Sequence, residues 1–125
     1  MHRSRWGAII IDCQTQNLEA AVNFWSRALG LAAAPADAAE PNYVTLESAP
    51  GEPAIEVQRV AHESRVHIDI ETNDIEAEAI RLTALGAKLV SRERRWWVMQ
   101  APTGQRFCLV GPQRAEFDTA AHVWD

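Results

Sequence analysis

The sequence has few cysteines and a deficit of positive charge. Its two cysteines, Cys13 and Cys108, lie in separate apolar runs, so neither a disulfide framework nor a structural zinc site built on a CxxC pair is expected. Lysine and arginine number 12 against 17 acidic residues, which gives a formal net charge of -5 at pH 7. This balance disfavours binding to nucleic acid or to an anionic membrane surface. We therefore expect a small-molecule ligand, with no nucleic acid and no membrane as partner.

Long apolar runs are also missing. The start of the chain holds only the short run 6–11 and no small-residue cleavage site, so we expect neither a signal peptide nor a membrane span, and a cytoplasmic location. The chain has 125 residues, 47% of them hydrophobic. That is enough for one domain with a core, but not for two independent domains. The sequence predicts a single domain over residues 1–125.

An internal repeat organises the chain. The segment IIDCQTQNLEA (10–20) aligns with HIDIETNDIEA (67–77), and each copy continues through a helical pattern to Ala-Leu-Gly. Further on, each half has a Pro/Gly stretch between two strand-like runs, which is typical of a hairpin. The repeat predicts two modules of the same order, strand-helix-strand-strand-strand, over about 6–59 and 65–110, with a tail at 111–125. The expected strands lie near 7–13, 31–35, 42–48, 54–59, 65–71, 87–92, 96–101 and 106–110, and the expected helices near 17–29 and 74–85.

Alternation within the segment 66–71 assigns side chains to two faces of a strand. Val66, Ile68 and Ile70 would face the helices, while His67, Asp69 and Glu71 would face the opposite, concave side. The helices have matching apolar stripes at helical spacing. These stripes comprise Leu18, Ala21, Val22, Trp25 and Leu29 in the first helix, and Ile75, Ala79 and Leu82 in the second.

The concave face is the predicted small-molecule site, because it collects polar groups on a curved sheet. His67 and Glu56 are the candidate catalytic residues there. A switchable imidazole proton suits His67 to catalysis or to an interior hydrogen bond, and partial burial would make Glu56 a general base. The predicted ligand-binding residues are Asp12, Tyr43, Gln58, Asp69, Trp97 and Cys108.

Structural roles compete with these assignments. Asp12 and Asp69 occupy equivalent repeat positions, and a bond to the backbone or to an arginine across the sheet is the favoured explanation of each carboxylate. Cys108 is a small thiol in an apolar run, the ordinary setting of a buried cysteine. The tail is mildly amphipathic and predicts a short helix that docks through Phe117, Val123 and Trp124.

The tandem modules, with NFWSRALGL ending the first helix and APTGQRFCLV closing the second module, resemble the glyoxalase/bleomycin-resistance/dioxygenase superfamily, also called the vicinal oxygen chelate superfamily. The resemblance covers roughly residues 6–110. It implies an α+β fold in which two βαβββ modules form a curved, open, barrel-like mixed sheet with helices on the outer face. It also implies a homodimer. Members include metal-dependent lyases, isomerases and dioxygenases, and metal-free proteins that sequester antibiotics.

The resemblance also assigns four metal-ligand positions, which fall on Ile10, Glu56, His67 and Cys108. Glu56 and His67 match the types that the superfamily uses. Ile10 cannot coordinate a metal, and Cys108 stands where glutamate is usual. We therefore expect no resident cofactor. If a divalent ion such as zinc, nickel or manganese binds, the resemblance implies Glu56, His67 and Cys108 as its ligands.

Three functions follow from these expectations. The leading one is a glyoxalase-like protein that binds a small organic molecule in the concave face without the full metal site. The second is a metal-dependent lyase or isomerase that uses Glu56 and His67. The third is a non-catalytic, antibiotic-sequestering dimer, in which Tyr43 and either Trp96 or Trp97 would stack on planar ligands. The sequence names neither the ligand nor the reaction.

Overall fold

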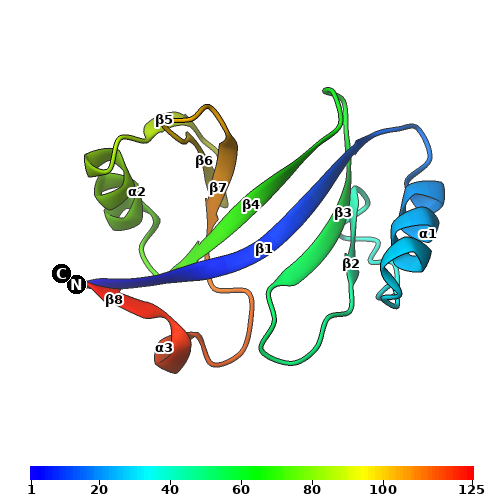
Figure 1. Ribbon diagram of the computed structural model, residues 1–125, viewed down its shortest axis with the longest axis horizontal. Helices are drawn as coiled ribbons and strands as arrows, with labels where there is room; N and C mark the ends of the chain where they lie inside the picture. Colours follow the sequence, from blue (N-terminus) through cyan, green and yellow to red (C-terminus); the bar gives the residue numbers. More distant parts are fainter. The chain divides into compact units, whose positions relative to one another are not determined.

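The computed structural model describes residues 1–125, which form two compact units (Figure 1). The first unit spans Ala8–Val66 and contains the first copy of the repeat. The second unit combines Met1–Gly7 with His67–Asp125 and contains the second copy. None of the helices has both the length and the apolar character that crossing a membrane requires.

In the first unit, a mixed sheet is covered by one helix (Figure 1). Strand β2 (Tyr43–Leu46) runs antiparallel to β3 (Ala54–Val60), and β3 runs parallel to the part of β1 (His2–Gln14) that belongs to this unit. Helix α1 (Leu18–Leu29) packs on β2 and β3. The expected order of strand, helix and hairpin is therefore present in this unit.

Helix α1 is capped at both ends. The Asn17 side chain caps the helix start by accepting a hydrogen bond from the Ala20 N–H, which satisfies one of the free amides of the first turn. Gly30 ends the helix in the left-handed conformation, with φ of 69°. Leu29 is 46% exposed, so its predicted place in the core is wrong. The core of this unit contains Val22, Leu46 and Val57, with Leu18, Ala21, Trp25, Leu31, Val44 and Ile55 packed around them.

The second unit has the full strand-helix-strand-strand-strand order. The elements are β4 (Arg65–Thr72), α2 (Ile75–Ala84), β5 (Lys88–Arg92), β6 (Trp96–Gln100) and β7 (Arg106–Val110). These four strands lie in the order β4-β7-β6-β5, in which β4 and β7 are parallel and the other neighbours are antiparallel. The Asp74 side chain caps the start of α2.

One face of this sheet forms the core with α2. Ala79, Ala87, Met99 and Leu109 are buried there, and Ile70, Ile75, Leu82, Trp97 and Phe107 pack against them. The predicted α2 stripe is confirmed. The predicted apolar face of β4 is only partly covered, because Val66 and Ile68 are 61% and 47% exposed. The reason is that α2 packs over β5, β6 and β7 rather than along β4.

The expected strand near 31–35 is reduced to a single bridge between Ala33 and Leu46. Two features of the sequence explain the loss. Alanine has a low preference for strands, and the segment reads LAAAPAD. Pro35 also lacks the N–H that a continued ladder would use.

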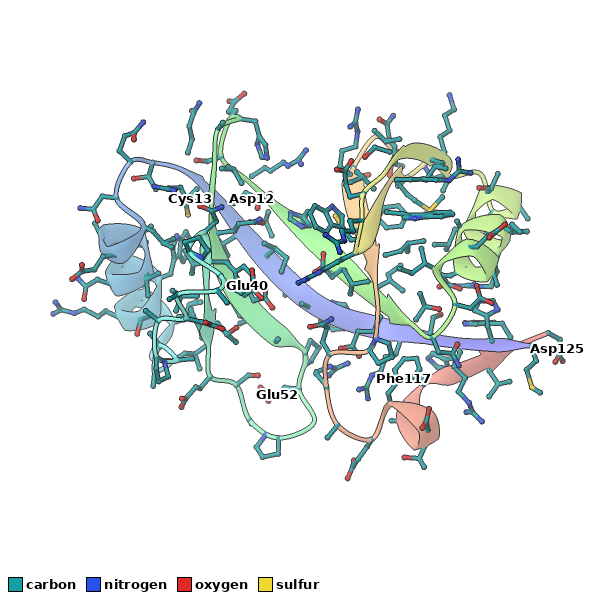
Figure 2. The ribbon with its side chains drawn as sticks, turned by 180° about the vertical axis from the view of Figure 1, so that it is seen from behind. Asp12, Cys13, Glu40, Glu52, Phe117 and Asp125 are labelled. Carbon is teal, nitrogen blue, oxygen red and sulfur yellow. The ribbon has the colours of Figure 1, made fainter.

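The tail forms a short helix and then a strand. Helix α3 (Phe117–Ala120) begins at Phe117, which Figure 2 labels, and β8 (His122–Trp124) pairs antiparallel with the start of β1. The two chain ends therefore lie side by side (Figure 1). Phe117 is buried as expected. Val123 and Trp124 belong to the strand, so the prediction of a single docking helix is wrong for them.

A buried acid in α2 joins both chain ends to the helix. Glu78 is fully buried and lies 2.8 Å from His2 Nε2, and it accepts two hydrogen bonds from Arg81, each 2.8 Å long. The Arg81 guanidinium lies 3.9 Å from the centre of the Trp124 ring, and Trp124 donates a hydrogen bond to Ser4. Burial would raise the pKa of Glu78, but hydrogen bonds with Arg81, His2 and Ser4 outweigh it and lower the pKa to about 2.

Replacing Glu78 with glutamine should remove this negative charge and the pH dependence that it gives to the stability of the fold. The folded pKa lies below the ordinary value of 4.5, so the ionised carboxylate stabilises the fold above that value, and the stabilisation disappears as the pH falls towards about 2. We expect Glu78→Gln to lower the free energy of unfolding by roughly 3 kcal/mol at pH 7. The free energy of unfolding of this variant should also fall less as the pH is lowered. Urea unfolding from pH 7 to pH 3 measures both effects. The exposed Glu76→Gln is the matched control, and equal losses in the two variants would contradict this account.

A second buried acid requires a glycine beside it. Glu71 is 1% exposed. Its carboxylate accepts hydrogen bonds from Arg5 Nε at 2.7 Å and from the Gln113 backbone N–H at 3.1 Å. A Cβ at Gly7 would lie 2.5 Å from Glu71 Cγ. Because both bonds hold the carboxylate in place, the side chain has little freedom to move aside.

Gly7→Ala should therefore destabilise the protein through overpacking. We expect a loss of about 1–3 kcal/mol in the free energy of unfolding, measured by chemical denaturation. Gly111→Ala is the control, because a Cβ there meets nothing within 4 Å. A Gly7→Ala protein as stable as the Gly111→Ala protein would show that the Glu71 side chain does move aside.

Candidate functional site

Three reactive side chains meet on the face of β4 and β7 opposite α2. The strand pairing places Asp69 directly beside Cys108, and His67 lies two residues before Asp69, on the same face of β4. Donor atoms of His67, Asp69 and Cys108 lie within 4.8 Å of one another. We call this group the His-Asp-Cys cluster. All three residues were predicted site residues, and the structure brings them together.

Core packing on the other face holds the cluster in place. Ile70 and Leu109 are register partners that pack into the α2 core. Each is next in sequence to a cluster residue, and neighbouring side chains in a strand point to opposite faces. The alternation that buries Ile70 and Leu109 therefore directs Asp69 and Cys108 to the opposite face of the sheet. The sequence prediction of two faces is correct for this pair of strands.

Asp69 is not fully satisfied by its neighbours. Its Oδ1 lies 3.4 Å from His67 Nε2, and the two side chains are 16% and 10% exposed. That separation is long for a hydrogen bond between these groups, and Asp69 Oδ1 has no hydrogen-bond partner although the atom is buried. An acceptor in this state is costly unless a ligand or an ion completes it.

The cluster offers two kinds of chemistry. An imidazole such as that of His67 can accept or donate a proton, and a carboxylate beside it can orient the ring. Imidazole nitrogen, carboxylate oxygen and thiolate sulfur are also the three donor types that zinc binds. The cluster therefore fits a borderline metal ion better than it fits magnesium or calcium, which prefer oxygen donors.

Asp69 is the residue that sequence reasoning left out of the metal-ligand set. The resemblance assigned Glu56, His67 and Cys108, whereas the described cluster contains Asp69. Glu56 belongs to the first unit, and its catalytic role stays a prediction. The signal for Asp69 was present in the sequence, because His-x-Asp in a strand puts both donors on one face.

The first unit aligns other predicted residues in rows across its sheet. Asp12 on β1, Gln58 on β3 and Tyr43 on β2 are consecutive register partners. Glu56 occupies the next row, between Ile10 and Thr45. Asp12 Oδ2 lies 3.4 Å from Arg65 Nε, so the arginine contact that its structural role requires is present. Figure 2 shows where Asp12 and Cys13 follow one another on β1.

Strand register extends the alignment of the two copies to β3 and β7. In the first unit, Asp12 is opposite Gln58, and in the second, Asp69 is opposite Cys108. Gln58, rather than Glu56, is therefore the register equivalent of Cys108. The sequence hides this equivalence because the hairpin loop at 47–53 is longer than the loop at 101–105.

Trp97 lies away from the cluster. Its register partner is Leu109, and it packs with the α2 core. The Arg92 guanidinium lies 4.8 Å from the centre of its ring. The register partner of Cys108 on β6 is Val98, so Trp97 faces the other side of the sheet. Its predicted ligand contact has no support from this placement.

Comparison with protein-family models gives one match. The model described as a glyoxalase-like domain matches residues 8–110, which include both copies of the repeat and all three residues of the His-Asp-Cys cluster. No curated protein matches this chain significantly in sequence.

Solved structures of similar fold cover nearly the whole chain. A methylmalonyl-CoA epimerase in complex with methylmalonyl-CoA and NH4+ is 19% identical, with a TM-score of 0.63 over 92% of this chain and 97% of the other. The methylmalonyl-CoA epimerase from Mycobacterium tuberculosis is 18% identical, with a TM-score of 0.59 over 86% and 87%. A glyoxalase/bleomycin resistance protein/dioxygenase superfamily member from Vibrio splendidus is 17% identical, with a TM-score of 0.55 over 90% and 100%. At these identities the likeness shows the fold alone, and it confirms the predicted α+β class.

Proposed function

This chain belongs to the glyoxalase-like domain family, and we propose that it binds a small organic molecule on the face of β4 and β7 that carries the His-Asp-Cys cluster. The observation that supports this proposal is the convergence of His67, Asp69 and Cys108 within 4.8 Å. Small-molecule sites commonly contain a few polar groups that converge on the ligand.

His67 is the proposed proton-transfer residue. Its ring nitrogen faces Asp69 across 3.4 Å, so the carboxylate can fix the orientation of the ring while the other nitrogen meets the ligand. The simplest reaction that the His67–Asp69 pair supports is removal or return of a proton on the carbon next to a carbonyl or carboxyl group. One solved structure of similar fold is a methylmalonyl-CoA epimerase in complex with methylmalonyl-CoA, a thioester with such a carbonyl group. Glu56 remains the predicted second acid–base residue, and the reaction class is that of a lyase or isomerase.

We also propose that the protein is a homodimer. Strand β5 is the last strand of the second unit's sheet, and its Leu89 and Val90 are 37% and 41% exposed. Open edges with apolar side chains are commonly covered by association with a second copy.

Substitution of His67 tests the proposed reaction. Small carboxylic acids, keto acids and thioesters that raise the thermal midpoint would be incubated with the protein in deuterated buffer. His67→Gln should abolish deuterium incorporation at the carbon beside the carbonyl, detected by proton NMR, because the exchanging group is gone. His62→Gln is the matched control, because His62 is exposed in the loop before β4. Exchange that persists in His67→Gln at the wild-type rate would refute the assignment.

The oligomeric state can be measured separately. Sedimentation equilibrium at micromolar concentration should give twice the chain mass of 13.9 kDa. Replacing Leu89 and Val90 by glutamate should shift the equilibrium towards monomer, because two charges would have to be buried at the contact. A monomeric wild type would contradict the dimer.

A further inference from the structure

We infer that Arg106, the first residue of β7, is an anion-binding residue that selects ligands with a carboxylate group. The inference deepens the proposed function and rests on it, because Arg106 lies on the same face of β4 and β7 as the His-Asp-Cys cluster. The ligand class is a small organic acid whose carboxylate is bonded to, or lies next to, the carbon that exchanges a proton.

Strand register places Arg106 on the cluster side of the sheet. Phe107 packs against the α2 core, and side chains alternate along a strand, so Arg106 shares the opposite face with Cys108. Ile68 of β4 is the register partner of Phe107. The residues one position earlier, His67 and Arg106, therefore lie side by side on parallel strands about 5 Å apart.

A glutamine orients the Arg106 side chain. Gln100 on β6 is the register partner of Arg106, and its Oε1 accepts a hydrogen bond of 3.0 Å from Arg106 Nε. This bond leaves the terminal nitrogens of the guanidinium, with their N–H donors, for a ligand. Because the glutamine amide is uncharged, Arg106 keeps its positive charge. A guanidinium held in this way can donate parallel hydrogen bonds to both oxygens of a carboxylate.

The charges on this face favour an anion. Lys88 and Arg106 stand at the two ends of one register row across β5, β6 and β7, and both are exposed. The acids of the same face are engaged elsewhere. Asp69 lies beside the imidazole of the cluster, and Glu71 is buried and paired with Arg5 at 2.7 Å. In a chain with a net charge of -5, two exposed cations in one row attract an anionic ligand to this face.

The position of Arg106 also fits the proposed proton transfer. Because Arg106 and His67 occupy adjacent strands, a ligand held by its carboxylate at the guanidinium would present the neighbouring carbon to the imidazole. Holding a reacting group in place in this way contributes to catalysis through proximity and orientation. An ester of the same acid lacks the negative charge, so it should bind less tightly than the acid.

Organic acids and their methyl esters test the inference without knowledge of the natural ligand. The probes are pyruvate, phenylpyruvate and malonate, each compared with its own methyl ester by calorimetric titration. We expect at least one acid to bind the wild type roughly tenfold more tightly than its ester, because only the acid forms a charged pair with Arg106.

Substitutions assign the anion-binding residue. Arg106→Gln should raise the dissociation constant of that acid roughly tenfold and leave the dissociation constant of its ester unchanged. Arg106→Lys should recover part of the affinity, because lysine keeps the charge but lacks the planar fork. The matched control is Arg94→Gln, which removes an exposed arginine from the turn at the other end of β6. This control should bind the acid as the wild type does.

Circular dichroism checks that each variant is folded. If Arg106→Gln does not fold, the ratio of acid affinity to ester affinity in Arg106→Lys decides the question, because a smaller ratio than in the wild type is expected there. Two results would overturn the inference. One is a wild type that binds none of the acids more tightly than its ester, and the other is an equal loss of acid affinity in Arg106→Gln and Arg94→Gln.

Deuterium exchange separates this inference from the proposed reaction. Exchange that requires His67 but shows no preference for acids over esters would support the reaction and refute the carboxylate site. Acids that bind through Arg106 without any exchange would support the carboxylate site and refute the reaction.

Discussion

The parallel pairing of β4 with β7 is the constraint on which the candidate site depends. It places Asp69 beside Cys108 and, on the reverse face, Ile70 beside Leu109. Burial of Ile70 and Leu109 under α2 fixes the strand register, since a slip of one residue would turn every side chain to the other face. Core packing and site geometry are therefore two consequences of one register. A change that disturbs the core of the second unit should also disturb the cluster.

The duplicated scaffold carries different chemistry in its two copies. Both units contain a parallel pair of strands with an aspartate at the same repeat position, Asp12 or Asp69. In the first unit the aspartate contacts Arg65, which gives it a structural partner. In the second it faces a histidine and a cysteine. At the other two positions of the cluster the copies differ, because the first copy has Ile10 and Gln58 where the second has His67 and Cys108.

Much of the fold and part of the candidate site were predictable from the sequence, for physical reasons. Period-two alternation gives the faces of β4, and the repeat gives the order of elements, because both depend on local patterns. Other features depend on tertiary contacts. The partners of Glu71 and Glu78 come from distant segments, and the exposure of Ile68 depends on where α2 packs. Loop lengths hid the equivalence of Gln58 and Cys108. Asp69 was expected on the ligand face but not among the metal ligands, because the resemblance directed attention to Glu56.

Diffraction from crystals soaked with a small carboxylic acid or thioester that raises the thermal midpoint tests most directly whether the cluster acts as one site. The account predicts ligand density on the face of β4 and β7, within hydrogen-bond distance of His67 or Asp69. Ligand density on another face of the molecule, with none beside His67, would contradict it.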